Sequence, residues 1–243
     1  MTIAERFAVA VARSAPDLPG AELLPERLAR ACAEVLPVDG AGISLFFASD
    51  RRLPLGASDD QAAVTERLQF TVGEGPCLTA HASGRPVVAQ EAEIASRWPA
   101  FYDELVTRTA VRDIISLPLV DENRGFGALD LYLVPPNDVR AVALFDALAV
   151  ASEVISVFTR AARADRDREG PAWLDAPAAE RRSLVWQAMG FVNAGLEISS
   201  DDALALLRAH AYSEGLQLDD LAAQVLSRQI PLEHLGFDRD QTS

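Results

Sequence analysis

The chain has 243 residues, of which 49% are hydrophobic and 24% are charged, a composition typical of a soluble protein that buries a core. Its formal charge of −14 excludes broad electrostatic attraction to nucleic acid, because such attraction needs cations that replace the counterions of phosphates. No apolar run approaches the ~20 residues of a membrane-spanning helix, so we expect a cytoplasmic protein without a membrane partner.

Helical and extended patterns alternate over the first half of the chain. Leu28 and Cys32 lie on one apolar helical stripe, which predicts a helix over residues 24–36. Residues 40–48, GAGISLFFA, predict a strand, and residues 58–70 predict a short helix. This alternation indicates a mixed domain.

A hairpin is the clearest local signal in this half. Two extended runs within residues 111–134 flank the turn-forming segment DENRG at residues 121–125. In the second run leucines alternate with Asp130 and Tyr132, which is the period of a half-buried strand. We therefore expect two antiparallel strands.

A long helix is predicted after the hairpin. Asn137 or Asp138 is placed to cap it at about Val139, and apolar residues that include Phe145 and Phe158 continue at near-helical spacing into a charge run. Helices before and after an antiparallel sheet predict an α+β sandwich. Since this apolar stripe exceeds what one small sheet covers, we expect a homodimer through helix pairing; the alternative is that the stripe closes the sheet.

The segment GEGPCLTA, residues 73–80, predicts a tight turn followed by a helix with Pro76 at its first position. Backbone amides at a helix start favour an anion, or a thiolate at Cys77, which predicts an anion or redox sensor. The alternative is that Cys77, like Cys32, is a small packing residue, and the frequency with which free cysteines are buried favours it.

Together these segments resemble a GAF domain, the small sensory fold of many bacterial regulators. The resemblance rests on GISLFF, GEGPCLTA, SLPLV and GALDLYL in this order, and it covers roughly residues 21–163. It implies a sensory domain over residues 1–165, with an antiparallel sheet, flanking helices and no assigned cofactor. An unidentified small-molecule ligand is then expected near Gly73, Glu74, Gly75 and Cys77.

The second half begins after a change in composition. Residues 166–177 carry a charge run, a glycine and prolines, which predicts a linker. Residues 178–235 are helical throughout and predict three helices, with Ser199 placed to cap the second and Gly215 placed to end it. Residues 236–243 are expected to be a disordered tail.

The first of these three helices carries two stripes. The expected core stripe consists of Leu184, Val185, Ala188, Phe191, Val192 and Gly195. The opposite stripe consists of Arg182, Trp186, Met189 and Asn193. A helix with only one buried face would carry charged residues there, so we expect this stripe to contact a partner. On the second helix Arg208 and Tyr212 lie together, and an arginine that holds phosphate beside a stacking tyrosine is a combination found in single-stranded RNA recognition.

This region resembles the ANTAR domain, a three-helix RNA-binding output module. The residues that match its motif are Ala188, Gly190, Ala203, Leu207, Arg208, Ala211, Ala222 and Val225. The order of the two domains resembles GAF and ANTAR regulators of actinobacterial type, which are transcription antiterminators that bind, as dimers, paired stem-loops of nascent leader RNA; no DNA partner is expected. The candidate RNA-binding residues are Arg181, Arg182, Trp186, Gln187, Met189, Gly190, Arg208 and Tyr212.

Two residues of this region bear directly on RNA binding. A glycine inside a helix costs about 1 kcal/mol relative to alanine, and Gly190 would let an RNA loop or another backbone approach closely. Met189 stands where the family usually has lysine, and residues 176–232 hold seven acids against four arginines, a net charge of −3. The alternatives are a regulator that acts through protein contacts of Trp186 and Met189, its GAF domain sensing a small molecule or redox state, and a sensor with a decaying output domain.

Catalytic motifs give no support for an enzyme. We find no nucleophile elbow, phosphate-binding loop or dinucleotide fingerprint in the sequence. His81, His210 and His234 are not paired at metal-ligand spacing, and the two cysteines lie far apart. We therefore expect no catalytic residue and no metal.

Overall fold

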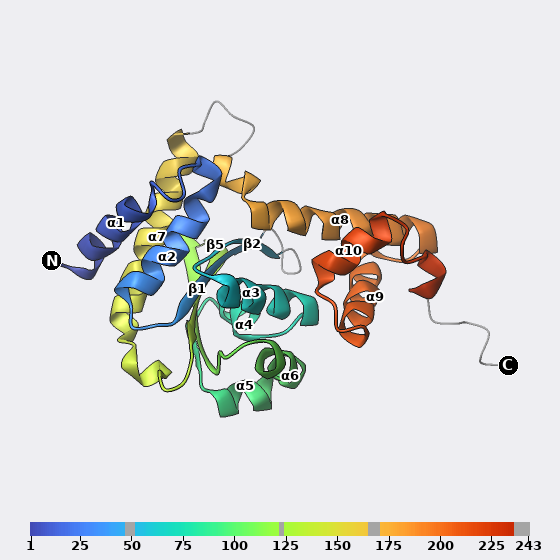
Figure 1. The fold of residues 1–243 in the computed structure, drawn as a ribbon, viewed down its shortest axis with the longest axis horizontal. Coiled ribbons are helices and arrows are strands. Elements are labelled where there is room, and N and C mark those ends of the chain that lie inside the picture. Colours follow the sequence, from blue (N-terminus) through green and yellow to red (C-terminus); the bar gives the residue numbers. More distant parts are fainter. Residues whose placement is uncertain (47–51, 122–123, 165–170, 236–243) are drawn as a thin grey trace. The chain divides into compact units, whose positions relative to one another are not determined.

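The computed structural model describes residues 1–46, 52–121, 124–164 and 171–235 (Figure 1). Its contacts divide the chain into two units. The first contains Met1–Gln69 and Glu74–Ala179, and the second contains Phe70–Gly73 and Glu180–Ser243. Among the described residues, no helix combines the length and the apolar character needed to cross a membrane.

The first unit is built on a five-stranded antiparallel sheet in the order β2-β1-β5-β4-β3. Its strands are β1 (Gly40–Phe46), β2 (Arg52–Ala57), β3 (Val87–Ala89), β4 (Asp113–Asp121) and β5 (Arg124–Leu133). The expected hairpin is formed by β4 and β5, with Ser116 opposite Asp130. Its turn residues Glu122 and Asn123 lie outside the described residues.

Helices cover both faces of this sheet. They are α1 (Ile3–Ser14), α2 (Leu24–Val35), α3 (Asp60–Val72), α4 (Pro76–Ser83), α5 (Glu91–Arg97), α6 (Pro99–Arg108) and α7 (Leu144–Ala164). Leu129, Leu131 and Leu133 of β5 share one apolar core with residues of α1, α2 and α7. The other face meets α3 and α4, so the sheet is the middle layer of an α+β fold.

The second face of β5 differs from the sequence expectation. A half-buried strand would expose Asp130 and Tyr132, but they are 0% and 1% exposed. The alternation in sequence therefore separates an apolar buried face from a polar buried face, and the polar residues meet partners on α3.

The long helix begins later than expected. The carboxylate of Asp138 accepts a hydrogen bond from the Arg140 amide at 2.8 Å and caps a short 3-10 helix, Val139–Ala141, so α7 starts only at Leu144. Phe158 is buried as part of the first unit's core, whereas Phe145 is 82% exposed. Strands β2 and β3 and helices α5 and α6 were not anticipated from the sequence.

The expected linker is partly a structured element of the first unit. Ala172–Asp175 forms a 3-10 helix, and the ring of Trp173 lies 5.1 Å from the ring of Phe158 in an edge-on contact. Trp173 and Ala176 belong to the same apolar core as α7. Residues 165–170 of the expected linker lie outside the described residues.

The three expected helices are present. They are α8 (Pro177–Leu196), which belongs to the second unit from Glu180 onward, α9 (Ser200–Ser213) and α10 (Leu218–Leu226). The Ser199 hydroxyl accepts a hydrogen bond from the Asp202 amide at 3.0 Å, as the capping spacing predicts, and Gly215 follows α9 with φ 63°. Of the predicted core stripe, Val185, Ala188 and Val192 are buried, Leu184 and Phe191 are half-buried, and Gly195 is exposed. The expected tail, residues 236–243, lies outside the described residues.

Candidate functional site

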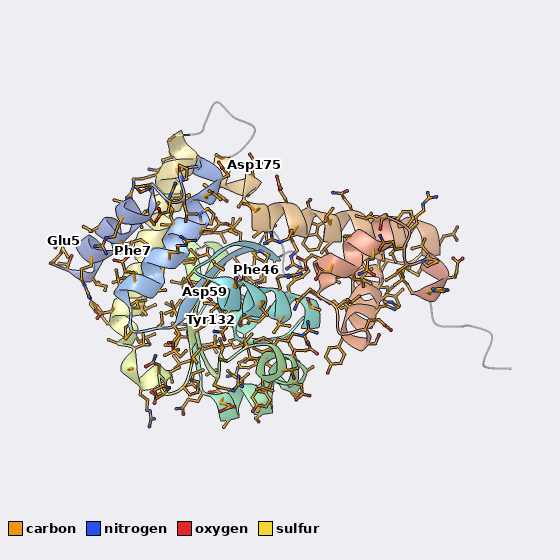
Figure 2. The ribbon with its side chains drawn as sticks, viewed as in Figure 1. Glu5, Phe7, Phe46, Asp59, Tyr132 and Asp175 are labelled. Carbon is orange, nitrogen blue, oxygen red and sulfur yellow. The ribbon has the colours of Figure 1, made fainter. Side chains whose placement is uncertain are left out.

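A cluster of buried polar side chains lies where β1, β2 and β5 meet α3, and we call it the buried polar cluster. None of its members is more than 2% exposed. Figure 2 labels one of them, Tyr132, among the side chains of the first unit. The members are Ser44, Arg52, Glu66, Gln69, Asp130 and Tyr132.

Glu66 is the centre of this cluster. Its Oε2 forms an ion pair with the Arg52 guanidinium and accepts a hydrogen bond from the Ser44 hydroxyl at 2.6 Å, and its Oε1 accepts one from the Tyr132 hydroxyl. Arg52 Nη1 also donates to the Glu66 carbonyl oxygen at 2.6 Å. The Glu66 carboxylate lies over Gly42, where any Cβ would collide with it. Sheet and helix are thus joined through one carboxylate.

Asp130 is the second carboxylate of the cluster. Its Oδ2 accepts a hydrogen bond from Gln69 Nε2 at 2.9 Å and lies 3.7 Å from Arg52 Nη2. Burial, and then the negative charge of Glu66, raise the pKa of Asp130 to about 7, although Arg52 opposes the shift. Asp130 therefore changes charge near neutral pH.

One guanidinium serves two buried carboxylates in this arrangement. Arg52 Nε has no hydrogen-bond partner among the described residues. A buried donor without a partner costs roughly 1–3 kcal/mol of stability. A charge change or a polar group bound here would therefore change the interactions among β2, β5 and α3 together.

The glycine-rich segment before α4 has the expected turn. Gly73 and Gly75 have φ angles of 81° and 140°, and α4 begins at Pro76. The Glu74 carboxylate accepts a hydrogen bond from the Phe101 amide at 3.0 Å and thus serves the first turn of α6. The Cys77 amide, which was expected to attract an anion, donates to Gln69 Oε1 at 2.9 Å. Side chains of this protein already occupy these positions.

The expected thiolate at Cys77 is not supported by its surroundings. The side chain is 0% exposed and packs with Phe46 and Ala128. Burial raises the pKa of the Cys77 thiol well above its ordinary value, even though Arg52 lowers it. Burial raises the pKa of Cys32 as well. The packing interpretation of both cysteines agrees with the structure, and the redox interpretation does not.

The eight candidate RNA-binding residues fall into three classes of exposure. Arg181, Gln187, Gly190 and Tyr212 are exposed, and Trp186 and Arg208 are half-buried. Arg182 and Met189 are 2% and 7% exposed, so the expectation that both face a partner outside the chain is not met. The stripe that contains them is mostly internal.

Arg182 and Met189 are buried because Phe70, a residue far away in the sequence, packs against this stripe. Within the second unit, the Arg182 guanidinium lies 3.6 Å from the centroid of the Phe70 ring, and the Trp186 ring meets it edge-on at 5.7 Å. Met189 belongs to the same apolar core as Phe70. Spacing along α8 identifies a stripe that needs a partner, but it does not identify Phe70 as that partner.

Gly190 is explained by no contact within the described chain. It lies inside α8, is exposed, and a Cβ placed on it would meet no atom within 4 Å. The exposed positions one turn away on either side, Gln187 and Ala194, are also uncharged. The missing side chain therefore leaves an open, neutral helix surface.

The buried polar cluster was missed by sequence reasoning. Its one local signal is the pair Asp130 and Tyr132 between leucines of β5, which was interpreted as a solvent-facing pattern. Arg52 and Glu66 come from other elements, at no spacing that would indicate a site. Within the described ranges, no group of three or more His, Cys, Asp and Glu residues is placed to hold a metal ion.

More than half of the chain matches a known protein family. Residues 21–152 match the family model of the GAF domain. The GAF domain from Acinetobacter phosphoenolpyruvate-protein phosphotransferase is 12% identical with a TM-score of 0.47, over 68% of this chain and 98% of that one. The corresponding domain from Coxiella burnetii is 13% identical with a TM-score of 0.47, over 68% and 99%.

A free methionine-R-sulfoxide reductase from Neisseria meningitidis also matches part of the chain. It is 17% identical with a TM-score of 0.44, over 66% of this chain and 93% of that one. No curated protein matches the chain.

Proposed function

Because the chain belongs to the GAF domain family, we propose that it is a signal-responsive regulator whose first unit receives the signal and whose second unit binds stem-loop RNA. By binding stem-loops of a nascent leader, it would prevent formation of a terminator hairpin. The RNA-binding part rests on the resemblance of residues 178–235 to the ANTAR domain. The proposal requires no catalytic residue, cofactor or metal.

The observation that carries the RNA-binding proposal is the open surface at Gly190. A helix interior loses stability by containing glycine, and no neighbour in the described chain accounts for it here. A partner whose backbone approaches α8 closely would account for it. The exposed neighbour Gln187 is uncharged, so it would not repel an RNA phosphate.

Two exposed side chains can add to this surface. Arg181 forms a long ion pair with Asp219, 3.9 Å between Nε and Oδ2, but its side chain is 53% exposed, so its guanidinium can still reach a phosphate. Tyr212 on α9 is 43% exposed and offers a ring for base stacking. Local contacts of this kind suit a protein whose net charge opposes unspecific binding.

We place signal reception at the buried polar cluster. Gln69 connects Asp130 with the Cys77 amide, so the glycine-rich segment first considered as a ligand site is hydrogen-bonded to this cluster. A polar ligand or a proton at the cluster would change interactions of β5, α3 and α4 at once. A small molecule that satisfies Arg52 Nε would suit it chemically.

RNA binding by the full chain tests the proposal. The probe is a tandem stem-loop RNA, titrated at two salt concentrations against wild type, Arg181→Ala, Tyr212→Ala and the control Arg85→Ala, an exposed arginine of the first unit. Arg181→Ala should weaken binding and reduce the salt slope by about one, and Tyr212→Ala should weaken it with little change of slope. Absence of binding at low salt would favour a regulator that acts through protein contacts.

We also propose that two copies pair through α7. Phe145 and Leu148 are 82% and 41% exposed, and Ser152 and Ile155 continue the three-and-four spacing of paired helices. Phe145 is the most exposed aromatic side chain among the described residues. A second copy would cover this face, and the resulting dimer would contain two RNA-binding units.

A further inference from the structure

Phe70 fills a slot formed by three of the candidate RNA-binding side chains. Arg182 lies over its ring at 3.6 Å, Arg208 approaches the same ring at 5.1 Å, and Trp186 closes one edge. Arg208 Nε also donates a hydrogen bond to the Phe70 carbonyl oxygen at 3.1 Å. The ring is 0% exposed in this slot.

The chemistry of the slot exceeds what a phenyl ring needs. A guanidinium that stacks on a ring and an indole that meets its edge recognise any flat aromatic group. A nucleobase presents the same flat face and adds hydrogen-bond acceptors on its edge, which a phenyl ring lacks. Arg208 here binds the neutral Phe70 carbonyl oxygen, and an anionic phosphate oxygen in the same place would be a stronger acceptor.

The occupant is held by hydrogen bonds that an incoming ligand would have to displace. The Thr71 hydroxyl accepts a hydrogen bond from the Leu218 amide at 3.1 Å and donates one to Gln217 Oε1 at 3.3 Å. These contacts anchor the segment Phe70–Gly73 to the start of α10. A substitution at Thr71 therefore loosens the occupant without changing the slot.

We propose that this slot is a nucleobase-binding site, and that Phe70 is the intramolecular occupant which an unstacked base of an RNA loop replaces. The inference rests on the proposed RNA-binding function and gives Arg182, although buried, a role in it. When the occupant fills the slot nine-tenths of the time, the apparent RNA affinity falls about tenfold. Removing the occupant should restore that factor.

The experiment measures binding of the tandem stem-loop RNA to the full chain by fluorescence anisotropy. Phe70→Ala empties the slot, and Thr71→Val weakens the anchor while the ring stays. Both should bind RNA about tenfold more tightly than wild type. Adding Arg182→Met to Phe70→Ala keeps apolar bulk but removes the stacking cation, and it should cancel the gain. Val88→Ala, an exposed apolar side chain on β3 of the first unit, is the control that should leave the RNA affinity unchanged.

The outcomes separate the two proposals. If wild type binds RNA and neither variant gains affinity, the slot proposal is overturned while RNA binding stands. If no variant binds RNA, both proposals fail. If only the loosened variants bind, occlusion by Phe70 is supported and is nearly complete in the wild type. Should Phe70→Ala lose its native circular dichroism, Thr71→Val decides alone.

Discussion

Replacing Asp130 by asparagine should remove a pH dependence of stability. The folded pKa of Asp130 is about 7, because burial and Glu66 disfavour its charge, whereas an exposed aspartate titrates near 3.8. The folded state therefore binds more protons than the unfolded state between these values. Asp130 therefore contributes most to the free energy of unfolding at the acid end of this window, and this contribution is lost as the pH rises to about 7.

The size of the effect follows from the shift of about three pKa units. Each unit corresponds to about 1.4 kcal/mol, so the free energy of unfolding of the first unit should fall by roughly 4 kcal/mol across the window. The steepest slope is about 1.4 kcal/mol per pH unit. In Asp130→Asn the amide keeps the size of the carboxyl group and the contact with Gln69, but this slope should vanish.

Urea unfolding between about pH 5 and 8 measures this slope. Trp98 and Trp173, both in the first unit, report its unfolding when Trp186→Phe removes the tryptophan of the second unit. Asp103→Asn, an exposed carboxylate on α6, should leave the slope unchanged. A wild-type curve without slope, or an equal slope in Asp130→Asn, would refute the reasoning.

Gly190→Ala should stabilise α8 by about 0.5–1 kcal/mol, measured as slower hydrogen exchange, and should weaken RNA binding. The reverse change one turn away, Ala194→Gly, should destabilise α8. Unchanged RNA affinity in Gly190→Ala would contradict an RNA role for the glycine. Cys77 should react with a thiol reagent far more slowly in the native chain than in denaturant, and equal rates would contradict its burial. Phe145→Glu should convert a dimer into a monomer in sedimentation experiments, and a dimer that survives the change would exclude α7 as the interface.

Elements with a strong local pattern could be predicted from the sequence. The β4 and β5 hairpin combines alternation with a turn segment, and α9 has a capping serine and a terminal glycine. Strand β2 was missed because Pro54 and Gly56 argue against a strand, yet β2 lies at the edge of the sheet, where one side needs no hydrogen-bond donors.

The candidate sites were less predictable because their partners are distant in the sequence. Asp130 meets Gln69 across 61 positions, and Arg208 meets Phe70 across 138. Alternation on β5 distinguishes two faces but does not tell whether a second helical layer covers the polar one. The need of Arg182 for a partner could be recognised from spacing, whereas the identity of that partner could not.

Two neighbouring residues in the last turn of helix α3 have different partners. Gln69 donates to Asp130 in the buried polar cluster, and Phe70, the next residue, fills the slot beside Arg182. If an RNA base displaces Phe70 and thereby disturbs Gln69, thermodynamic reciprocity requires that the signal and the RNA change each other's affinity by the same factor. The transcript would then act as an effector of the sensor, so that a leader RNA already bound would tune how strongly the protein responds to its signal.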